Sequence, residues 1–186
     1  VYAGYVSEVQ VQETGHVPEG AYWWTGEQDA SFRARLVYDD EYLYARIFVQ
    51  DSNVVTGWCD TCIADRIELF LDVAMPEQNS RSRYISRISR DQVVVRNSQD
   101  SGLYTFTVSL GDFADNLPRV SIKTTDELDA MQVKARKQVR VVSAPRSGGY
   151  IVKLRIPFAL LGYQKAPVDE QNTVEFGCAI AVHDYD

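Results

Sequence analysis

Short runs of alternating hydrophobic and polar residues recur along this chain, whereas the three- and four-residue spacing of an amphipathic helix hardly occurs. The clearest run is 65–72, in which Ile67, Leu69 and Leu71 alternate with Glu68 and other polar or aromatic residues. Successive side chains of a strand point to opposite faces. The run therefore predicts a strand with one face in a hydrophobic core and the other open to a ligand or to solvent.

Turn residues separate further runs of this kind. The polar stretch 38–41 and the glycine-containing stretch 147–149 are each predicted to join two strands of a hairpin. Pro157 is expected to end a strand, one helical turn is expected over 158–161, and 112–125 is expected to form a loop. Strands are predicted at 6–11, 32–37, 43–49, 65–72, 84–89, 92–96, 104–110, 131–142, 150–156 and 173–182.

Many short strands with turns between them predict an all-β fold, here an antiparallel, jelly-roll-like β-sandwich of two packed sheets. The chain has 186 residues, of which 45% are hydrophobic. That length is sufficient for one good core and is short for two. We therefore expect a single domain over residues 1–186.

The charge balance limits the possible partners. With 19 basic and 26 acidic residues, the net charge is −7 and the pI is about 4.9, which disfavours nucleic acid or an anionic membrane surface as a partner. No apolar run approaches the roughly twenty residues that span a bilayer, so no membrane insertion is expected. The start at Val1, without a methionine or a signal-peptide pattern, predicts a mature form or an excised piece.

The three cysteines form no metal signature by themselves. Cys59 and Cys62 lack the second pair or nearby histidines of a zinc site, and Ile63 stands where a c-type haem attachment requires histidine. Two interpretations of this pair stay open, namely a local disulfide beside Trp58, which implies an oxidising compartment, and a reduced, inert pair. Cys178 is expected to be a small buried hydrophobic residue.

Several short blocks in a fixed order resemble the family 9 carbohydrate-binding modules over roughly residues 30 to 186. The chain also resembles the wider DOMON superfamily of β-sandwiches, some of which bind sugars and some haem. The resemblance implies a sandwich fold and a glycan ligand that packs on an aromatic side chain. The blocks are 39–44, 49–51, Trp58, 65–72, 149–157 and 172–184.

The resemblance assigns roles to individual residues. Trp58 looks like the tryptophan that stacks on the sugar, and Glu68 like the acid that accepts hydrogen bonds from sugar hydroxyls. Arg87 resembles their basic partner, and His183 stands where the family often has asparagine. A second platform tryptophan of the family lies beyond this chain, so Trp23 or Trp24 is the candidate to replace it. These roles suit the chemistry of a sugar, because an apolar pyranose face packs on an aromatic ring while the sugar hydroxyls form hydrogen bonds with charged groups.

Each of these roles has a purely structural alternative. Trp58 could cap the core, and Glu68 could be a solvated residue on a sheet face. Trp23 and Trp24 could form a hydrophobic lid, or at least one of them could pack in the core. The residues alone leave these alternatives open.

Three aspartates lie near predicted strand ends, in loops rich in oxygen atoms. They are Asp51, Asp184 and Asp186. Such clusters can bind calcium at a structural site, and the modules that the chain resembles commonly bind it. The alternative is that these are solvated turn residues.

The sequence does not predict an enzyme. It contains no nucleophile elbow, no phosphate-binding glycine loop and no zinc-protease motif. Glu68 and Asp72 share a strand face, but four residues at about 3.3 Å each place them about 13 Å apart, farther than the usual pair of glycosidase carboxylates.

Three functions are therefore considered. The first is a non-catalytic carbohydrate-binding domain of a secreted or surface protein, located outside the cell or in the periplasm and attached to other domains. The second is a haem-binding electron-transfer domain of the DOMON type, with Met131 or Met75 and His183 or a lysine as axial ligands. The third is a structural or adhesive domain that has lost its ligand.

Overall fold

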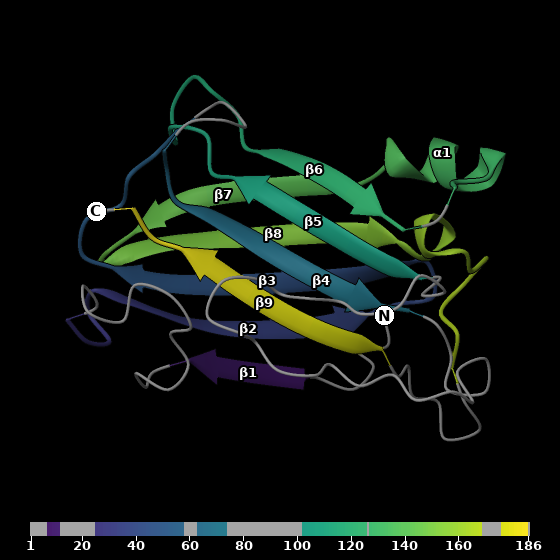
Figure 1. Ribbon diagram of the computed structural model, residues 1–186, viewed down its shortest axis with the longest axis horizontal. Coiled ribbons are helices and arrows are strands. Elements are labelled where there is room, and N and C mark those ends of the chain that lie inside the picture. The colour runs from purple at the N-terminus through teal and green to yellow at the C-terminus, as the bar shows by residue number, and fades with distance from the viewer. Residues whose placement is uncertain are drawn as a thin grey trace.

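The computed structural model describes residues 25–57, 63–73, 102–125, 127–168 and 176–185, and the backbone of 7–11. Its strands form two antiparallel sheets, and in Figure 1 the four-stranded sheet lies in front of the five-stranded sheet and crosses it obliquely. This arrangement confirms the predicted all-β sandwich. In sheet order, the five strands are β1 (Ser7–Val11), β2 (Ala30–Tyr38), β3 (Tyr42–Asp51), β8 (Gly149–Pro157) and β7 (Arg140–Arg146), and the four are β6 (Arg119–Thr124), β5 (Leu103–Ser109), β4 (Arg66–Asp72) and β9 (Gly177–His183).

The core lies between the sheets and follows the predicted alternation. On β4, Ile67, Leu69 and Leu71 are buried, while Glu68 between them is only half-buried. The central strands β3 and β8 supply the opposite wall, with a buried residue at every second position. Buried aliphatic and aromatic side chains stabilise the sandwich through loss of apolar surface from water. The predicted hydrophobic face of the strand at 65–72 is therefore confirmed.

Two predicted hairpins are also confirmed. In the turn between β2 and β3, Asp39 Oδ1 accepts hydrogen bonds from the backbone N–H groups of Glu41 and Tyr42, and its Oδ2 accepts one from the Tyr44 hydroxyl. The turn between β7 and β8 needs a glycine at position 149, because a Cβ there would lie 2.2 Å from the Val49 carbonyl oxygen.

The structure corrects two predicted elements. The predicted strand 131–142 begins as helix α1 (Ala130–Arg136), and β7 starts only at its end. Asp129 caps this helix, accepting a hydrogen bond from the Gln132 backbone while the Gln132 side chain accepts one from the Asp129 backbone. The predicted loop 112–125 contains strand β6, in which Ile122 packs into the core.

The remaining predictions have mixed outcomes. The helical turn after Pro157 is confirmed as the 3-10 helix η3 (Phe158–Leu161). Cys178 is exposed rather than buried, since it lies near the start of the edge strand β9. The predicted strands 84–89 and 92–96 lie outside the described residues. No helix in the described part of the chain is long and apolar enough to cross a membrane.

Candidate functional site

Three aspartates meet between the two sheets at one end of the sandwich. Asp51 ends β3 on the same face as the buried Val49, and Asp65 precedes β4 on the same face as the buried Ile67. Asp184 follows β9, opposite Asp65 if the pairing of the two strands continues by one residue. One ligand atom from each aspartate lies within 4.8 Å of the others. We call these three residues the aspartate cluster.

Backbone groups hold Asp65 within the aspartate cluster. Its Oδ2 accepts a hydrogen bond from the Val55 N–H at 2.8 Å, and its Oδ1 accepts one from the Tyr185 N–H at 3.0 Å. Asp51 Oδ1 accepts one from the Asn53 N–H at 2.7 Å. The cluster therefore fixes the start of the β3–β4 connection and the segment after β9 to the same end of the sandwich.

The carboxylates of the aspartate cluster repel one another in a buried place. Burial, followed by the neighbouring Asp51 carboxyl, raises the pKa of Asp65 to about 7. The pKa of Tyr150 is raised well above its usual value, first by burial and then by the negative charges of the cluster. The Tyr150 hydroxyl is buried without a hydrogen-bond partner among the described residues. Buried carboxylates this close together are stabilised by a shared proton or by a cation.

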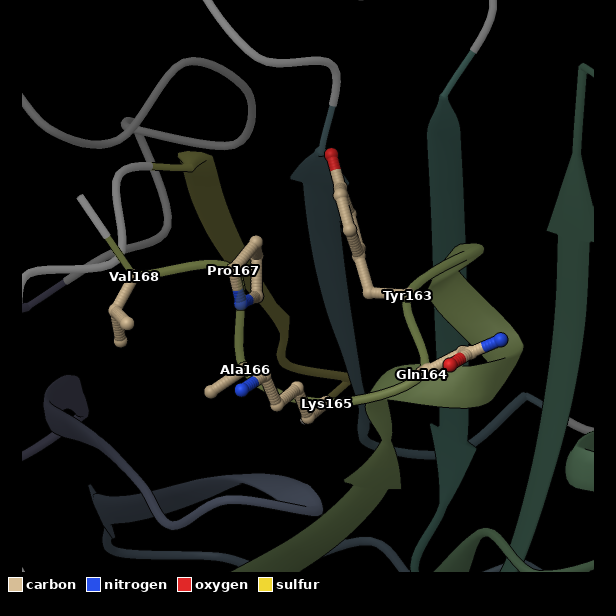
Figure 2. A pocket seen from close by; sticks show the side chains of 6 residues that line it. All are labelled: Tyr163, Gln164, Lys165, Ala166, Pro167 and Val168. Atoms are coloured by element: carbon tan, nitrogen blue, oxygen red, sulfur yellow. The ribbon is translucent and has the colours of Figure 1, made fainter.

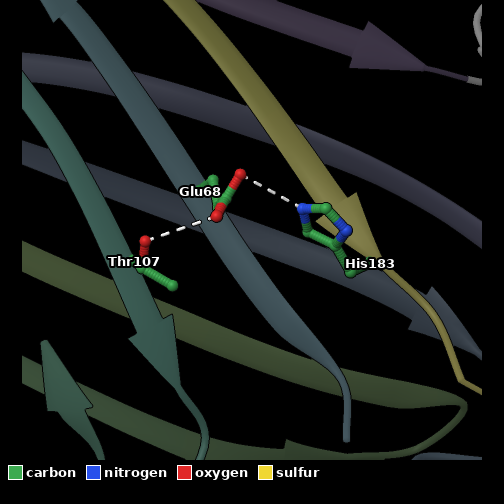
Figure 3. Close-up of polar contacts among 3 residues, drawn as sticks. All are labelled: Glu68, Thr107 and His183. Atoms are coloured by element: carbon green, nitrogen blue, oxygen red, sulfur yellow. Dashed lines mark hydrogen bonds and ion pairs between the residues drawn. The ribbon is translucent and has the colours of Figure 1, made fainter. Parts of the chain in front are cut away.

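A second polar group lies on the outer face of the four-stranded sheet, beside the same end (Figure 3). Glu68 of β4 points to solvent between β5 and β9. Its Oε2 is 3.2 Å from His183 Nε2, and its Oε1 accepts a hydrogen bond from the Thr107 hydroxyl at 3.3 Å. This contact with His183 is the largest cause of a lowered Glu68 pKa. Glu68 is therefore a carboxylate held at both oxygens while 24% of its side-chain surface remains exposed.

A cation and an aromatic ring lie beside this group. Arg66 stands opposite His183 in the pairing of β4 with β9, and its guanidinium carbon lies 5.5 Å from the centre of the Tyr185 ring. Arg66, Glu68, Thr107, His183 and Tyr185 together form the Glu68 site. A carboxylate, a guanidinium and a ring at one place can bond to hydroxyl groups and pack on an apolar sugar face.

The hollow drawn in Figure 2 is a different feature. It is open and shallow, with a volume of about 590 Å³, and residues 163–168 line it. The Tyr163 hydroxyl donates to the carbonyl of Val73, which follows the far end of β4. Val73 follows Glu68 by five residues, which at about 3.3 Å each places this end roughly 17 Å from Glu68. The hollow brings no group of charged side chains together, so we do not place the functional site there.

The structure brings together four of the sequence-predicted site residues, with Glu68 and His183 in one group and Asp51 and Asp184 in the other. The other predicted ligand or metal residues, Trp24, Trp58, Arg87 and Asp186, lie outside the described residues, as do Cys59 and Cys62.

Sequence reasoning missed Asp65, Arg66, Thr107 and Tyr185 as members of these groups. Asp65 carried a usable signal, because it stands two residues before Ile67 and so belongs to the buried face of that strand. Thr107 and Tyr185 carried none, since strand pairing alone brings Thr107 opposite Glu68.

The haem alternative needs Met131 or Met75 close to His183. Met131 lies on α1, and the next residue, Gln132, donates a hydrogen bond to the hydroxyl of Tyr104, which pairs with Leu71 near the end of β4. His183, in contrast, pairs with Arg66, the first residue of β4. The structure therefore places Met131 and His183 at opposite ends of the sandwich. Met75 lies outside the described residues.

Comparison with known proteins gives a family, and the similar solved structures include two complexes. Both are of a family 9 carbohydrate-binding module from Caldicellulosiruptor kristjanssonii. The complex with cellotriose is 20% identical with a TM-score of 0.39, and the match covers 69% of this chain and 49% of that one. The complex with glucose is 18% identical with a TM-score of 0.44, covering 84% and 61%. This chain therefore spans about half the length of the protein in the first structure.

A search of curated proteins gave no significant match. The family match, in contrast, extends over residues 3–186 and is to the family described as carbohydrate family 9 binding domain-like. Because this match includes nearly the whole sequence, the chain belongs to that family.

Proposed function

We propose that this chain is a non-catalytic carbohydrate-binding domain of a secreted or cell-surface protein, and that its ligand is a polysaccharide or oligosaccharide. The family match over residues 3–186 is the observation that carries the proposal. The Glu68 site supports it, because its carboxylate is oriented by two neighbours and still reaches solvent. Sugar hydroxyls are recognised by such fixed, charged acceptors.

In this proposal each residue has a separate task. Glu68 accepts hydrogen bonds from sugar hydroxyls, and Thr107 and His183 hold its carboxylate. Trp58 supplies the stacking ring, since it lies in the connection between Asp51 and Asp65, whose two ends are fixed at the aspartate cluster. Arg87 and Trp24 remain further candidates for contact with the sugar.

The test is calorimetric titration with cello-oligosaccharides, one of which the related module binds, and with a wider sugar panel. We expect Glu68→Gln to weaken binding about tenfold or more, since a hydrogen bond to a charged group contributes about 1.5–3 kcal/mol. Trp58→Ala should abolish it. Glu41→Gln, which removes an exposed carboxylate in the distant β2–β3 turn, is the matched control. No saturable binding to any sugar would favour the structural or adhesive role.

We also propose that the aspartate cluster binds a calcium ion. The donor set fits, because Ca²⁺ prefers carboxylate and carbonyl oxygens, and Asp51 and Asp65 are 3% and 1% exposed. The unsatisfied Tyr150 hydroxyl beside the cluster is a further oxygen atom. Asp186, the third aspartate expected from the sequence, is a candidate to add another. When bound, the ion would neutralise the carboxylates and join the two sheets at the end where the Glu68 site lies.

Direct calcium binding tests this second proposal. We expect one ion to bind with micromolar or tighter affinity and to raise the melting temperature, because a ligand that binds only the folded state stabilises it. Asp65→Asn should remove the site, while Asp40→Asn, in an exposed turn, should leave it intact. Equal calcium binding by wild type and Asp65→Asn would refute the proposal and leave the shared proton as the account of the cluster.

A further inference from the structure

The outer face of the five-stranded sheet is basic. We use the name basic face for the side chains of β2, β3, β7 and β8 that point away from the other sheet. None of the outward positions on these four strands holds an acidic residue, although the chain as a whole has a net charge of −7; on the edge strand β1, Glu8 pairs with Arg35. The basic residues at its centre are Arg33, Arg35, Arg46, Arg146, Lys153 and Arg155.

Strand register places like charges directly opposite one another on the basic face. Arg46 of β3 pairs with Arg35 of β2 and with Lys153 of β8, so three cations form one row, and this row ends at Glu8 of β1, which pairs with Arg35. Arg155 of β8 pairs with Arg140 of β7 in the same way. Like charges at directly opposed positions destabilise a sheet. Arg46 and Lys153 are exposed and make no ion pair with a described residue, so folding alone does not account for this row.

Aromatic rings lie between these cations and hold them. The guanidinium groups of Arg33 and Arg146 lie 5.8 and 5.6 Å from the centre of the Phe48 ring, and that of Arg155 lies 4.6 Å from the Tyr42 ring. Cation–π contacts of this kind fix the planes of the guanidinium groups on the surface. The basic face therefore presents cations that are already ordered and that can form paired hydrogen bonds to carboxylate or sulfate groups.

From the charge rows and the ordered guanidinium groups we infer that the basic face binds an anionic polysaccharide, a glycan chain bearing carboxylate or sulfate groups. The regular spacing of cations across neighbouring strands fits a polymer with repeated charges better than a single anion. The choice of a glycan over another polyanion rests on the proposed carbohydrate-binding function. Because the two outer faces point in opposite directions, the basic face and the Glu68 site can each hold a chain at the same time.

The experiment compares binding of polygalacturonate and dextran sulfate with binding of neutral dextran. The test variant combines Arg35→Gln, Arg46→Gln and Lys153→Gln. The control variant combines Lys123→Gln, Lys134→Gln and Lys137→Gln, which removes the same charge from exposed positions on β6 and around α1. Thermal unfolding of the test variant checks that it is folded. Removing the like charges around Arg46 should offset the loss of the charge opposite Glu8, so the melting temperature should stay close to that of wild type.

We expect wild type and the control variant to bind at least one of the anionic polymers and not neutral dextran. At low salt the test variant should bind about tenfold more weakly or worse, and added salt should weaken wild-type binding, because charge attraction is screened. Equal losses in the two variants, or no binding of either anionic polymer by wild type, would overturn the inference.

Two further measurements separate this inference from other accounts. Glu68→Gln should lose neutral sugar binding and keep binding to the anionic polymer, so a failure at the Glu68 site is distinguishable from a failure at the basic face. Polyglutamate provides an acidic polypeptide with a similar repeat of carboxylates. If polyglutamate binds as tightly as the glycans, the partner is an acidic protein and the glycan assignment is wrong.

Discussion

At the scale of single residues, the geometry around Glu68 explains how a strand carboxylate becomes a binding group. A free carboxylate on a sheet face rotates and is solvated, whereas Glu68 is held by Thr107 at one oxygen and by His183 at the other. Fixing the acceptor in advance removes part of the entropy cost of binding a ligand. The close contact with His183 also keeps Glu68 charged, since it lowers the carboxyl pKa.

This pairing predicts the pH dependence of sugar binding. Because the folded-state pKa of Glu68 is lowered, its charged form persists below the ordinary value of 4.5, and affinity is lost only as pH falls through the lowered value. His183→Ala removes the largest cause of the lowering, so affinity should begin to fall at a higher pH. Titrations between pH 3.5 and 7 measure this shift. Thr107→Val is the control, with a smaller shift expected, and an acid limb that stays unchanged in His183→Ala would contradict the assignment.

At the scale of elements, α1 depends on a capping box that the strand pattern hides. Asp129 and Gln132 exchange hydrogen bonds at the start of the helix, and the Gln132 side chain also donates to the Tyr104 hydroxyl and the Leu160 carbonyl. The helix is therefore anchored to β5 and η3 through its capping residue. One local motif thus holds a short helix that could not persist alone.

The cap can be removed by a single substitution. Asp129→Ala should lower the free energy of unfolding by about 1 kcal/mol, the usual cost of losing an N-cap. Asp129→Ser retains a capping oxygen and should lose much less. Urea denaturation of the three proteins measures the difference. Equal stability of wild type and Asp129→Ala would mean that the tertiary bonds of Gln132 hold the helix without the cap.

The same region shows what sequence patterns can and cannot specify. In 131–142, Val133 and Ala135 fit a strand alternation, yet Asp129 followed three residues later by Gln132 is a helix-start signal that overrides it. The octet 65–72 was predicted correctly, because its aliphatic residues all lie on one face. Asp65 was not predicted to join Asp51 and Asp184, since only the pairing of β4 with β9 and the packing of the two sheets bring them together.

At the scale of the whole molecule, the aspartate cluster connects the two sheets. Asp51 belongs to the five-stranded sheet, while Asp65 and Asp184 flank strands of the four-stranded sheet. Their mutual repulsion opposes close packing of the sheets at that end when no cation is present. The connection between β3 and β4, which contains Trp58, starts and ends at this cluster. Charge compensation there therefore affects both the stability of the sandwich and the proposed binding end.

This repulsion makes the stability of the metal-free protein fall as pH rises. The pKa of Asp65 is about 7 in the folded chain against an ordinary 3.8, so between these values the folded state holds a proton that the unfolded state has released. In a chelator, the melting temperature should therefore be highest near pH 4, decline toward pH 7 and level off above it. Asp51→Asn removes one negative charge, and its amide can donate to Asp65, so the decline should be smaller.

Calcium should reverse the order of these two proteins. At pH 8 with a chelator, Asp51→Asn should melt above wild type, because it has less buried charge. With millimolar calcium, wild type should melt above Asp51→Asn, since only the intact cluster gains from the ion. Asp40→Asn controls for the loss of one aspartate and should follow wild type in both conditions. A wild-type melting temperature independent of both pH and calcium would show that the cluster neither repels nor binds a cation.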